Sequence, residues 1–112
     1  MLYTISAEVI HGEGYGKKLG FPTVNLDVDE EKQREFPKDG VYGGIALLRG
    51  KEYMAAIVVG PNGKLEAHLI GFKDDAYGEY VTLKIEKFIR EYKNFDTEEE
   101  LINQIKKDLK QI

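Results

Sequence analysis

The chain has 112 residues, which suffice for one compact domain with a single hydrophobic core and are too few for two ordinary domains. Hydrophobic residues make up 42% of it and the formal net charge is -4, which excludes a disordered, collagen-like or coiled-coil protein and favours a folded, mildly acidic one. No repeat, low-complexity tract or linker interrupts the sequence, so we interpret residues 1–112 as one domain.

Cysteine is absent, which excludes disulfide bonds, thiolate metal sites and cysteine nucleophiles and makes the reducing cytoplasm the expected location. The sequence shows neither a signal-peptide pattern nor an apolar stretch of the roughly 20 residues that cross a bilayer, so we expect no membrane association. Lysine and arginine residues are dispersed and outnumbered by acidic residues, which argues against a nucleic-acid partner.

Alternating apolar and polar residues predict a series of β-strands. These strands cover residues 5–10, 40–48, 53–59, 64–70 and 80–89. The polar residues 49–52 predict a hairpin between the second and third strands, and Pro61-Asn62-Gly63 predicts the next turn.

The hydrophobic period changes after residue 96, where apolar residues recur at spacings of three and four and predict an amphipathic helix. Its apolar face comprises Leu101, Ile102, Ile105, Leu109 and Ile112. Thr97, followed by Glu100, matches a capping box at the start of this helix. Short antiparallel strands followed by one helix predict a mainly β fold closed into a small barrel, because closure removes exposed strand edges. The helix is expected to plug or flank one end.

Residues 12–25 hold four of the twelve glycines, together with Lys17 and Lys18, and we expect this segment to be irregular. Glycine allows backbone N–H groups to converge on phosphate oxygens, and a lysine adds positive charge, so the segment is a candidate anion site. The pattern matches neither a Walker loop nor a Rossmann fingerprint. On glycine content alone, a hairpin loop without a ligand is an equally good interpretation.

Two pairs of polar residues are each spaced to share one face of an extended segment. Thr23 and Asn25 can offer a hydroxyl and an amide oxygen to a magnesium ion that carries nucleotide phosphates, although turn capping is the commoner role of such residues beside a proline. Glu66 shares a face with His68 and is a candidate general base. An outward-facing, solvated glutamate fits the alternation of that strand equally well.

Taken in order, the motifs of this chain resemble the riboflavin kinase family, which occurs alone or as the C-terminal half of bacterial bifunctional FAD synthetases. The similarity is carried by residues 11–16, 18–26, 39–42, 65–70, 75–78 and 89–95. The run Leu-Gly-Phe-Pro-Thr-Val-Asn at residues 19–25 is the most specific part, and the other segments support it by their order and spacing.

The resemblance implies a six-stranded antiparallel Greek-key barrel with a C-terminal helix, and Mg²⁺-dependent transfer of the ATP γ-phosphoryl group to the 5′-hydroxyl of riboflavin, giving FMN. It implies that Glu66 is the catalytic base and that Thr23 and Asn25 hold magnesium. It assigns nucleotide contacts to Gly12, Gly14, Lys17, Thr23, Leu69 and Tyr77, and flavin contacts to Arg90, Lys93 and Phe95. ATP and riboflavin are then the partners of a protein that we expect to be a monomer.

Two features depart from the family pattern. Tyr15 stands where members usually carry arginine, and residues 60–63 form a shorter connection than is usual. The short connection keeps a second interpretation open, a non-catalytic flavin- or nucleotide-binding module. An oligonucleotide-binding barrel is a third interpretation, which lacks the expected basic surface.

Overall fold

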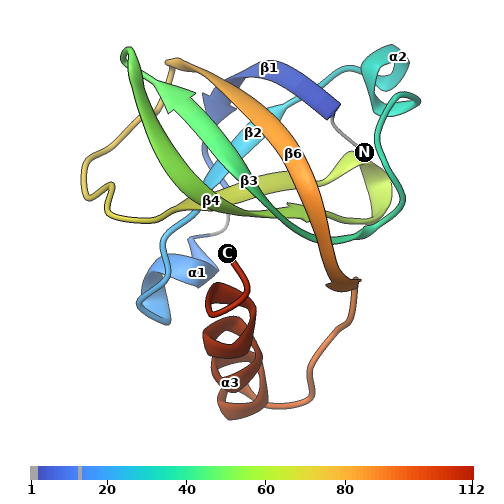
Figure 1. Cartoon of the computed structure of the whole chain (residues 1–112), viewed down its shortest axis with the longest axis vertical. Coiled ribbons are helices and arrows are strands. Elements are labelled where there is room, and N and C mark those ends of the chain that lie inside the picture. Colours follow the sequence, from blue (N-terminus) through green and yellow to red (C-terminus); the bar gives the residue numbers. More distant parts are fainter. Residues whose placement is uncertain (1–2, 13) are drawn as a thin grey trace.

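The computed structural model describes residues 3–12 and 14–112 and shows a barrel with one long helix beside it (Figure 1). The elements, in chain order, are β1 (Tyr3–Ile10), α1 (Tyr15–Lys18), β2 (Val24–Asp27), α2 (Glu30–Gln33), β3 (Gly40–Leu48), β4 (Lys51–Val59), the 3-10 turn η1 (Pro61–Gly63), β5 (Leu65–Leu69), β6 (Tyr80–Glu91) and α3 (Glu98–Leu109). None of the helices within these two ranges is long and apolar enough to span a membrane.

The six strands close into an antiparallel barrel in the order β1-β2-β5-β4-β3-β6. Strands β3, β4 and β5 pair consecutively, and β6 returns to pair with β3, which is the connection of a Greek key. The remaining pairings place β2 between β1 and β5. The predicted fold class is therefore confirmed.

Side chains of alternate residues fill the barrel interior. Val81, Leu83 and Ile85 on β6 are each at most 1% exposed, as the alternation of that strand predicts. Small residues such as Ala46 and Ala67, both fully buried, leave space for these larger chains. The interior is thus a packed core, and the outer wall and the rims are left for ligands.

Two connections differ from the sequence prediction. Strand β4 begins at Lys51 rather than at residue 53, because Arg49 and Gly50 both have positive φ, 55° and 74°, and together complete a two-residue turn. The glycine-rich segment, which we expected to be irregular, contains the single helical turn α1.

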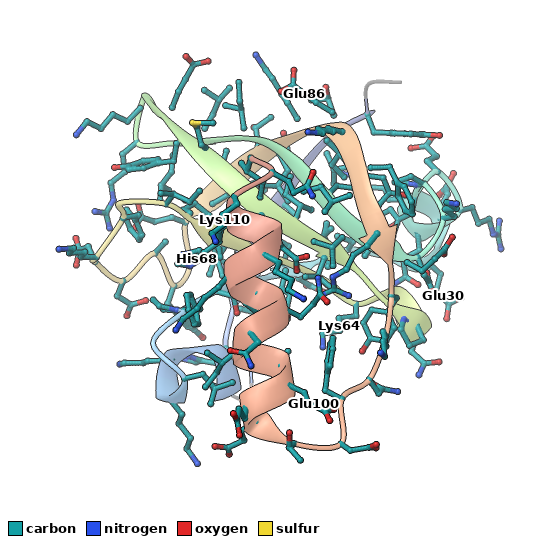
Figure 2. All side chains as sticks on the ribbon, turned by 60° about the horizontal axis from the view of Figure 1, so that its bottom comes forward. Glu30, Lys64, His68, Glu86, Glu100 and Lys110 are labelled. Carbon is teal, nitrogen blue, oxygen red and sulfur yellow. The ribbon has the colours of Figure 1, made fainter. Side chains whose placement is uncertain are left out.

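Helix α3 flanks the barrel, with Glu100 toward one of its ends and Lys110 toward the other (Figure 2). The Thr97 hydroxyl oxygen accepts a hydrogen bond from the Glu100 backbone N–H at 3.1 Å, which confirms the hydroxyl half of the predicted capping box. Leu101 and Ile105 are partly buried on the side of α3 that faces the outer wall of the barrel. The helix thereby forms a cover over the outer wall.

Candidate active site

Two surface cavities share one wall. The first encloses about 560 Å³ and the second about 500 Å³. Four residues line both cavities, and they are Gly12, Gly14, Thr23 and Asn25. Molecules bound in the two cavities would therefore meet at the glycine-rich segment and the start of β2.

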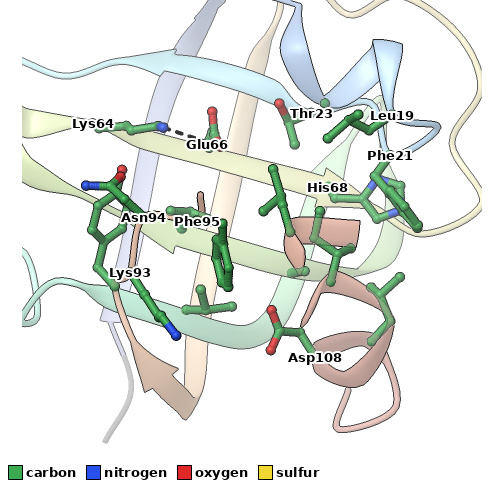
Figure 3. A pocket seen from close by; sticks show the side chains of 18 of the residues that line it. Leu19, Phe21, Thr23, Lys64, Glu66, His68, Lys93, Asn94, Phe95 and Asp108 are labelled. Atoms are coloured by element: carbon green, nitrogen blue, oxygen red, sulfur yellow. Dashed lines mark ion pairs between the residues drawn. The ribbon is translucent and has the colours of Figure 1, made fainter. Parts of the chain in front are cut away.

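The first cavity lies between α3 and the outer face of β4 and β5 (Figure 3). The pleat of β5 accounts for its polar lining. Leu65, Ala67 and Leu69 point into the core and are at most 3% exposed, so the intervening Glu66 and His68 point outward into the cavity. The outward orientation of Glu66 is the one that the alternation of this strand indicates. The side chain is not fully solvated, because α3 covers the cavity that it lines.

Glu66 lies beside the shared wall. Its side chain is 21% exposed, and Lys64 Nζ lies 3.9 Å from its Oε1 atom (dashed line in Figure 3). In the pairing of β2 with β5, Glu66 is directly opposite Asn25, so the two side chains are cross-strand neighbours. Figure 3 also shows the Thr23 hydroxyl extending to the same side as the Glu66 carboxylate. The candidate base and the candidate metal ligands are therefore adjacent.

His68 supports the corner that precedes β2. Its Nδ1 atom lies 2.7 Å from the Pro22 carbonyl oxygen, and because a carbonyl only accepts hydrogen bonds, Nδ1 carries the hydrogen. The Phe21 ring meets the imidazole edge-on, with centroids 6.0 Å apart. These contacts fix the backbone next to Thr23, which gives His68 a structural role.

The residues assigned to the flavin form one cluster at the end of β6. The Arg90 guanidinium and the Lys93 ammonium lie 5.5 and 5.4 Å from the centroid of the Phe95 ring. Arg90 Nε donates to Asp108 Oδ1 at 2.9 Å, and Gln104 Nε2 donates to the same oxygen at 2.9 Å. The Phe95 ring thus lies against the Arg90 guanidinium, which is itself bonded to Asp108 of α3.

Asp108 is a cavity residue that the sequence analysis missed. It is 4% exposed and lines the first cavity. It follows Ile105 by three positions and Leu101 by seven, which places a carboxylate on the apolar face of α3. A charged residue on an apolar helix face is rare without a partner, and this signal would have identified it.

The second cavity opens at a rim of the barrel. Core residues Val9 and Leu69 form part of its lining, together with Lys17 from the glycine-rich segment. The ring of Tyr77 stacks on His11 with centroids 3.7 Å apart and an interplanar angle of 30°. Glycine backbone, a lysine and a stacked aromatic pair are groups that suit phosphates and a flat base.

The acidic rim of the second cavity is held by an arginine. Asp74 lines this cavity, and Glu79 follows it on the same connection. Hydrogen bonds from the Arg49 side chain lower the pKa of both carboxyl groups below their ordinary range. The Arg49 hydrogen bonds therefore favour the charged form of both groups.

Gly12 provides space for Asn25 at the shared wall. A Cβ atom built on Gly12 would overlap the Asn25 amide group. The Thr23 hydroxyl and the Asn25 amide present neutral oxygen donors where the two cavities meet. Donors of this kind suit a magnesium ion that takes its other ligands from phosphates and water, so the residues present fit Mg²⁺ bound with a nucleotide.

Every predicted site residue lines at least one of the two cavities. The first cavity is lined by Glu66, Arg90, Lys93 and Phe95, the second by Lys17, Leu69 and Tyr77, and both by Gly12, Gly14, Thr23 and Asn25. The Tyr15 side chain lies outside the described structure. The short connection at 60–63 contains η1 and is closed by a hydrogen bond from Gly60 N–H to the Lys64 carbonyl at 2.9 Å.

The family model and two curated relatives that match this chain carry the same description, riboflavin kinase. The family model described as "Flavokinase: Riboflavin kinase" matches residues 1–112. The chain is 37% identical over 113 residues to the Bacillus subtilis protein named RNA-binding riboflavin kinase RibR, covering 94% of this chain and 47% of that protein. It is 34% identical over 117 residues to a Mus musculus riboflavin kinase, covering 93% and 74% of the two chains. The chain thus spans about half the length of the bacterial relative.

Solved structures share the fold. A Trypanosoma brucei riboflavin kinase superposes with a TM-score of 0.73 at 24% identity, over 97% of this chain and 73% of that one. A Streptococcus pneumoniae structure described as a macrolide-efflux protein superposes with a TM-score of 0.87 at 32% identity, over 96% of this chain and 37% of that one. Both superpositions cover nearly the whole barrel and helix of the present chain.

Proposed function

Because the chain belongs to the riboflavin kinase family, as the match over residues 1–112 shows, we propose that it transfers the γ-phosphoryl group of ATP to the 5′-hydroxyl of riboflavin, giving FMN and ADP. The observation that carries this proposal is the wall shared by the two cavities. Phosphoryl transfer depends mainly on holding donor and acceptor in line, and two cavities that meet at Thr23 and Asn25 provide such a place.

Riboflavin binds in the first cavity. A volume of about 560 Å³ lies in the range of small-molecule sites, and its lining combines apolar residues of α3 with the Phe95 ring, which suit a flat aromatic ring system. Arg90 and Lys93 place positive charge beside that ring. The ribityl chain then extends toward Glu66 at the shared wall.

ATP binds in the second cavity. The backbone of Gly12 and Gly14, with Lys17, contacts the phosphates, and Leu69 and Tyr77 contact the base. Thr23 and Asn25 hold Mg²⁺, which when bound neutralises charge on the phosphates. The phosphate end of this site borders the first cavity at the shared wall.

Glu66 accepts the proton of the riboflavin 5′-hydroxyl. The hydroxyl oxygen forms a bond to the γ-phosphorus atom, the bond between that phosphorus and the bridging oxygen breaks, and ADP leaves with the electron pair. The position of Glu66 opposite Asn25 supports this role, because it places the carboxylate next to the residues proposed to hold the phosphates and the metal.

The test is to incubate the protein with riboflavin and Mg-ATP and to follow FMN and ADP by chromatography, with EDTA and ATP-free samples as controls. Formation of both products in equal amounts is expected. Flavin or nucleotide binding by folded protein without FMN would instead support the non-catalytic module. A salt-dependent mobility shift of single-stranded oligonucleotides would favour the third interpretation.

Three further expectations stay predictions for this chain, namely a monomer, a cytoplasmic location and no nucleic-acid partner. The Bacillus subtilis relative is named RNA-binding, and the present chain spans 47% of its length. The oligonucleotide sample of the experiment above tests the last expectation directly.

A further inference from the structure

The Arg49 guanidinium makes four hydrogen bonds to one irregular segment, residues 72–79. Nε and Nη2 donate to the two carboxylate oxygens of Glu79 at 2.8 and 2.6 Å, and Nη1 donates to Asp74 Oδ2 at 2.7 Å. Nη2 also donates to the backbone carbonyl of Asp75 at 2.7 Å. A planar fork of donors fixes the orientation as well as the distance of the groups it binds.

The segment that Arg49 holds is part of the wall of the second cavity, since residues 72–77 line it. Within the wall, Asp75 Oδ1 accepts a hydrogen bond from the Tyr77 backbone N–H at 2.9 Å, and Tyr77 stacks on His11. Arg49 itself lies behind this wall, on the turn between β3 and β4. Its contacts therefore reach the cavity through the backbone and side chains of the segment.

The backbone conformation of the turn does not favour an arginine at position 49. The φ angle of Arg49 is 55°, in the left-handed region that residues with bulky side chains rarely adopt. Asparagine followed by Gly50 would satisfy such a turn with less strain. The side-chain contacts to residues 72–79, rather than the turn itself, therefore account for the arginine at this position.

We propose that Arg49 is a positioning residue for the second cavity, because its guanidinium holds residues 72–79 in the conformation that receives the ligand. The identity of that ligand as a nucleotide rests on the proposed function. Arg49 acts through Asp74, Asp75 and Glu79 and contacts no reacting atom. Its removal should therefore weaken nucleotide binding selectively.

The variant Arg49→Asn separates this role from folding. It removes the fork and installs Asn-Gly, the preferred sequence for a turn with two positive φ angles, so the hairpin is retained. We expect the KM for ATP to rise about tenfold, the order expected from losing one net charge-assisted hydrogen bond. The KM for riboflavin and kcat at saturating ATP should stay within about twofold of wild type, as for loss of uniform binding.

Two further variants serve as controls. Arg49→Lys keeps the charge but not the fork and should give an intermediate KM for ATP. Arg34→Asn makes the same change at an exposed position that lines neither cavity and should behave as wild type. An unchanged KM for ATP in Arg49→Asn would overturn the proposal. A parallel rise in both KM values with a lower melting temperature would do so as well, because it would indicate a global structural role.

A calorimetric titration with Mg-ADP keeps this test independent of turnover. If the wild-type protein forms no FMN, the proposed function fails, but weaker Mg-ADP binding by Arg49→Asn would still support the positioning role. Equal Mg-ADP binding by the two proteins, or no binding by the wild type, would overturn it.

Discussion

Arg90 and Asp108 form an ion pair that joins β6 to α3, with Nη2 2.9 Å from Oδ2 and only 5% of the Asp108 side chain exposed. Such a buried carboxylate is tolerated because both of its oxygens are bonded to donors, including Gln104 on its own helix. The pair therefore connects the helix that covers the first cavity to the strand that carries Arg90, one of the residues proposed to contact the flavin.

Asp108→Asn should lower the free energy of unfolding by about 3 kcal/mol, because it leaves the Arg90 guanidinium without its counter-charge in a half-buried setting. Urea denaturation measures this loss. The double variant Arg90→Met with Asp108→Leu should be less destabilised than Asp108→Asn, since no lone charge remains. A loss within about 0.5 kcal/mol, the usual range for surface changes, would contradict the burial of the pair.

Glu66→Gln keeps the shape of the side chain and removes its capacity to accept a proton. We expect turnover to fall by about 10²- to 10⁴-fold, the usual contribution of a general base, while Mg-ADP binding stays unchanged. Glu86→Gln on the exposed face of β6 is the matched control and should keep full activity. Wild-type turnover in Glu66→Gln would show that another group accepts the proton.

Local patterns predicted much of the fold because its strands alternate inward and outward over the packed core. The period of two predicted that Glu66 and His68 share an outward face, and the period of three and four predicted α3. The four-residue strand β2 is too short to show a period, so the sequence indicated only an extended segment there. The β3–β4 turn was misjudged because an arginine at positive φ leaves no signal in the sequence.

The parts of the site that depend on long-range pairing lay beyond sequence reasoning. Glu66 faces Asn25 only because β2 pairs with β5 across 41 positions of the chain, the difference between residue numbers 66 and 25. The contacts of Arg49 with residues 74–79 likewise arise from barrel closure and the packing of two connections. Resemblance to a family suggested the roles of Glu66 and Asn25, whereas nothing in it pointed to Arg49.

Acidification should weaken the link between Arg49 and its two carboxylates. The folded-state pKa values of Asp74 and Glu79 are lowered mainly by the Arg49 hydrogen bonds, so the unfolded chain binds more protons than the folded chain in mild acid. The stabilisation is present above the ordinary values of about 3.9 and 4.3 and is lost as the pH falls below them. Melting temperatures from pH 7 to pH 3 should therefore fall more steeply for wild type than for Arg49→Asn. The difference between the two slopes should be smaller at high salt. Parallel curves would contradict this link.

Gly12→Ala tests how closely the shared wall is built around Asn25. The new Cβ atom would overlap the Asn25 amide group, which must then rotate away from the position proposed for the metal. We expect activity at limiting Mg²⁺ to fall by about 10- to 100-fold, as when the support of a metal ligand is lost, with partial recovery at high Mg²⁺. Turnover measured over a range of Mg²⁺ concentrations gives both quantities.

The same change on an Asn25→Ala background decides how Gly12 acts. With the amide removed, the added methyl group has nothing to displace, so Gly12→Ala should cause little loss beyond that of Asn25→Ala alone. If the two losses instead multiplied, Gly12 would act independently of Asn25, through direct approach of its backbone to the phosphates. A non-additive result would show that Gly12 acts through Asn25 at the shared wall, where a Cβ atom on residue 12 would overlap the Asn25 amide group.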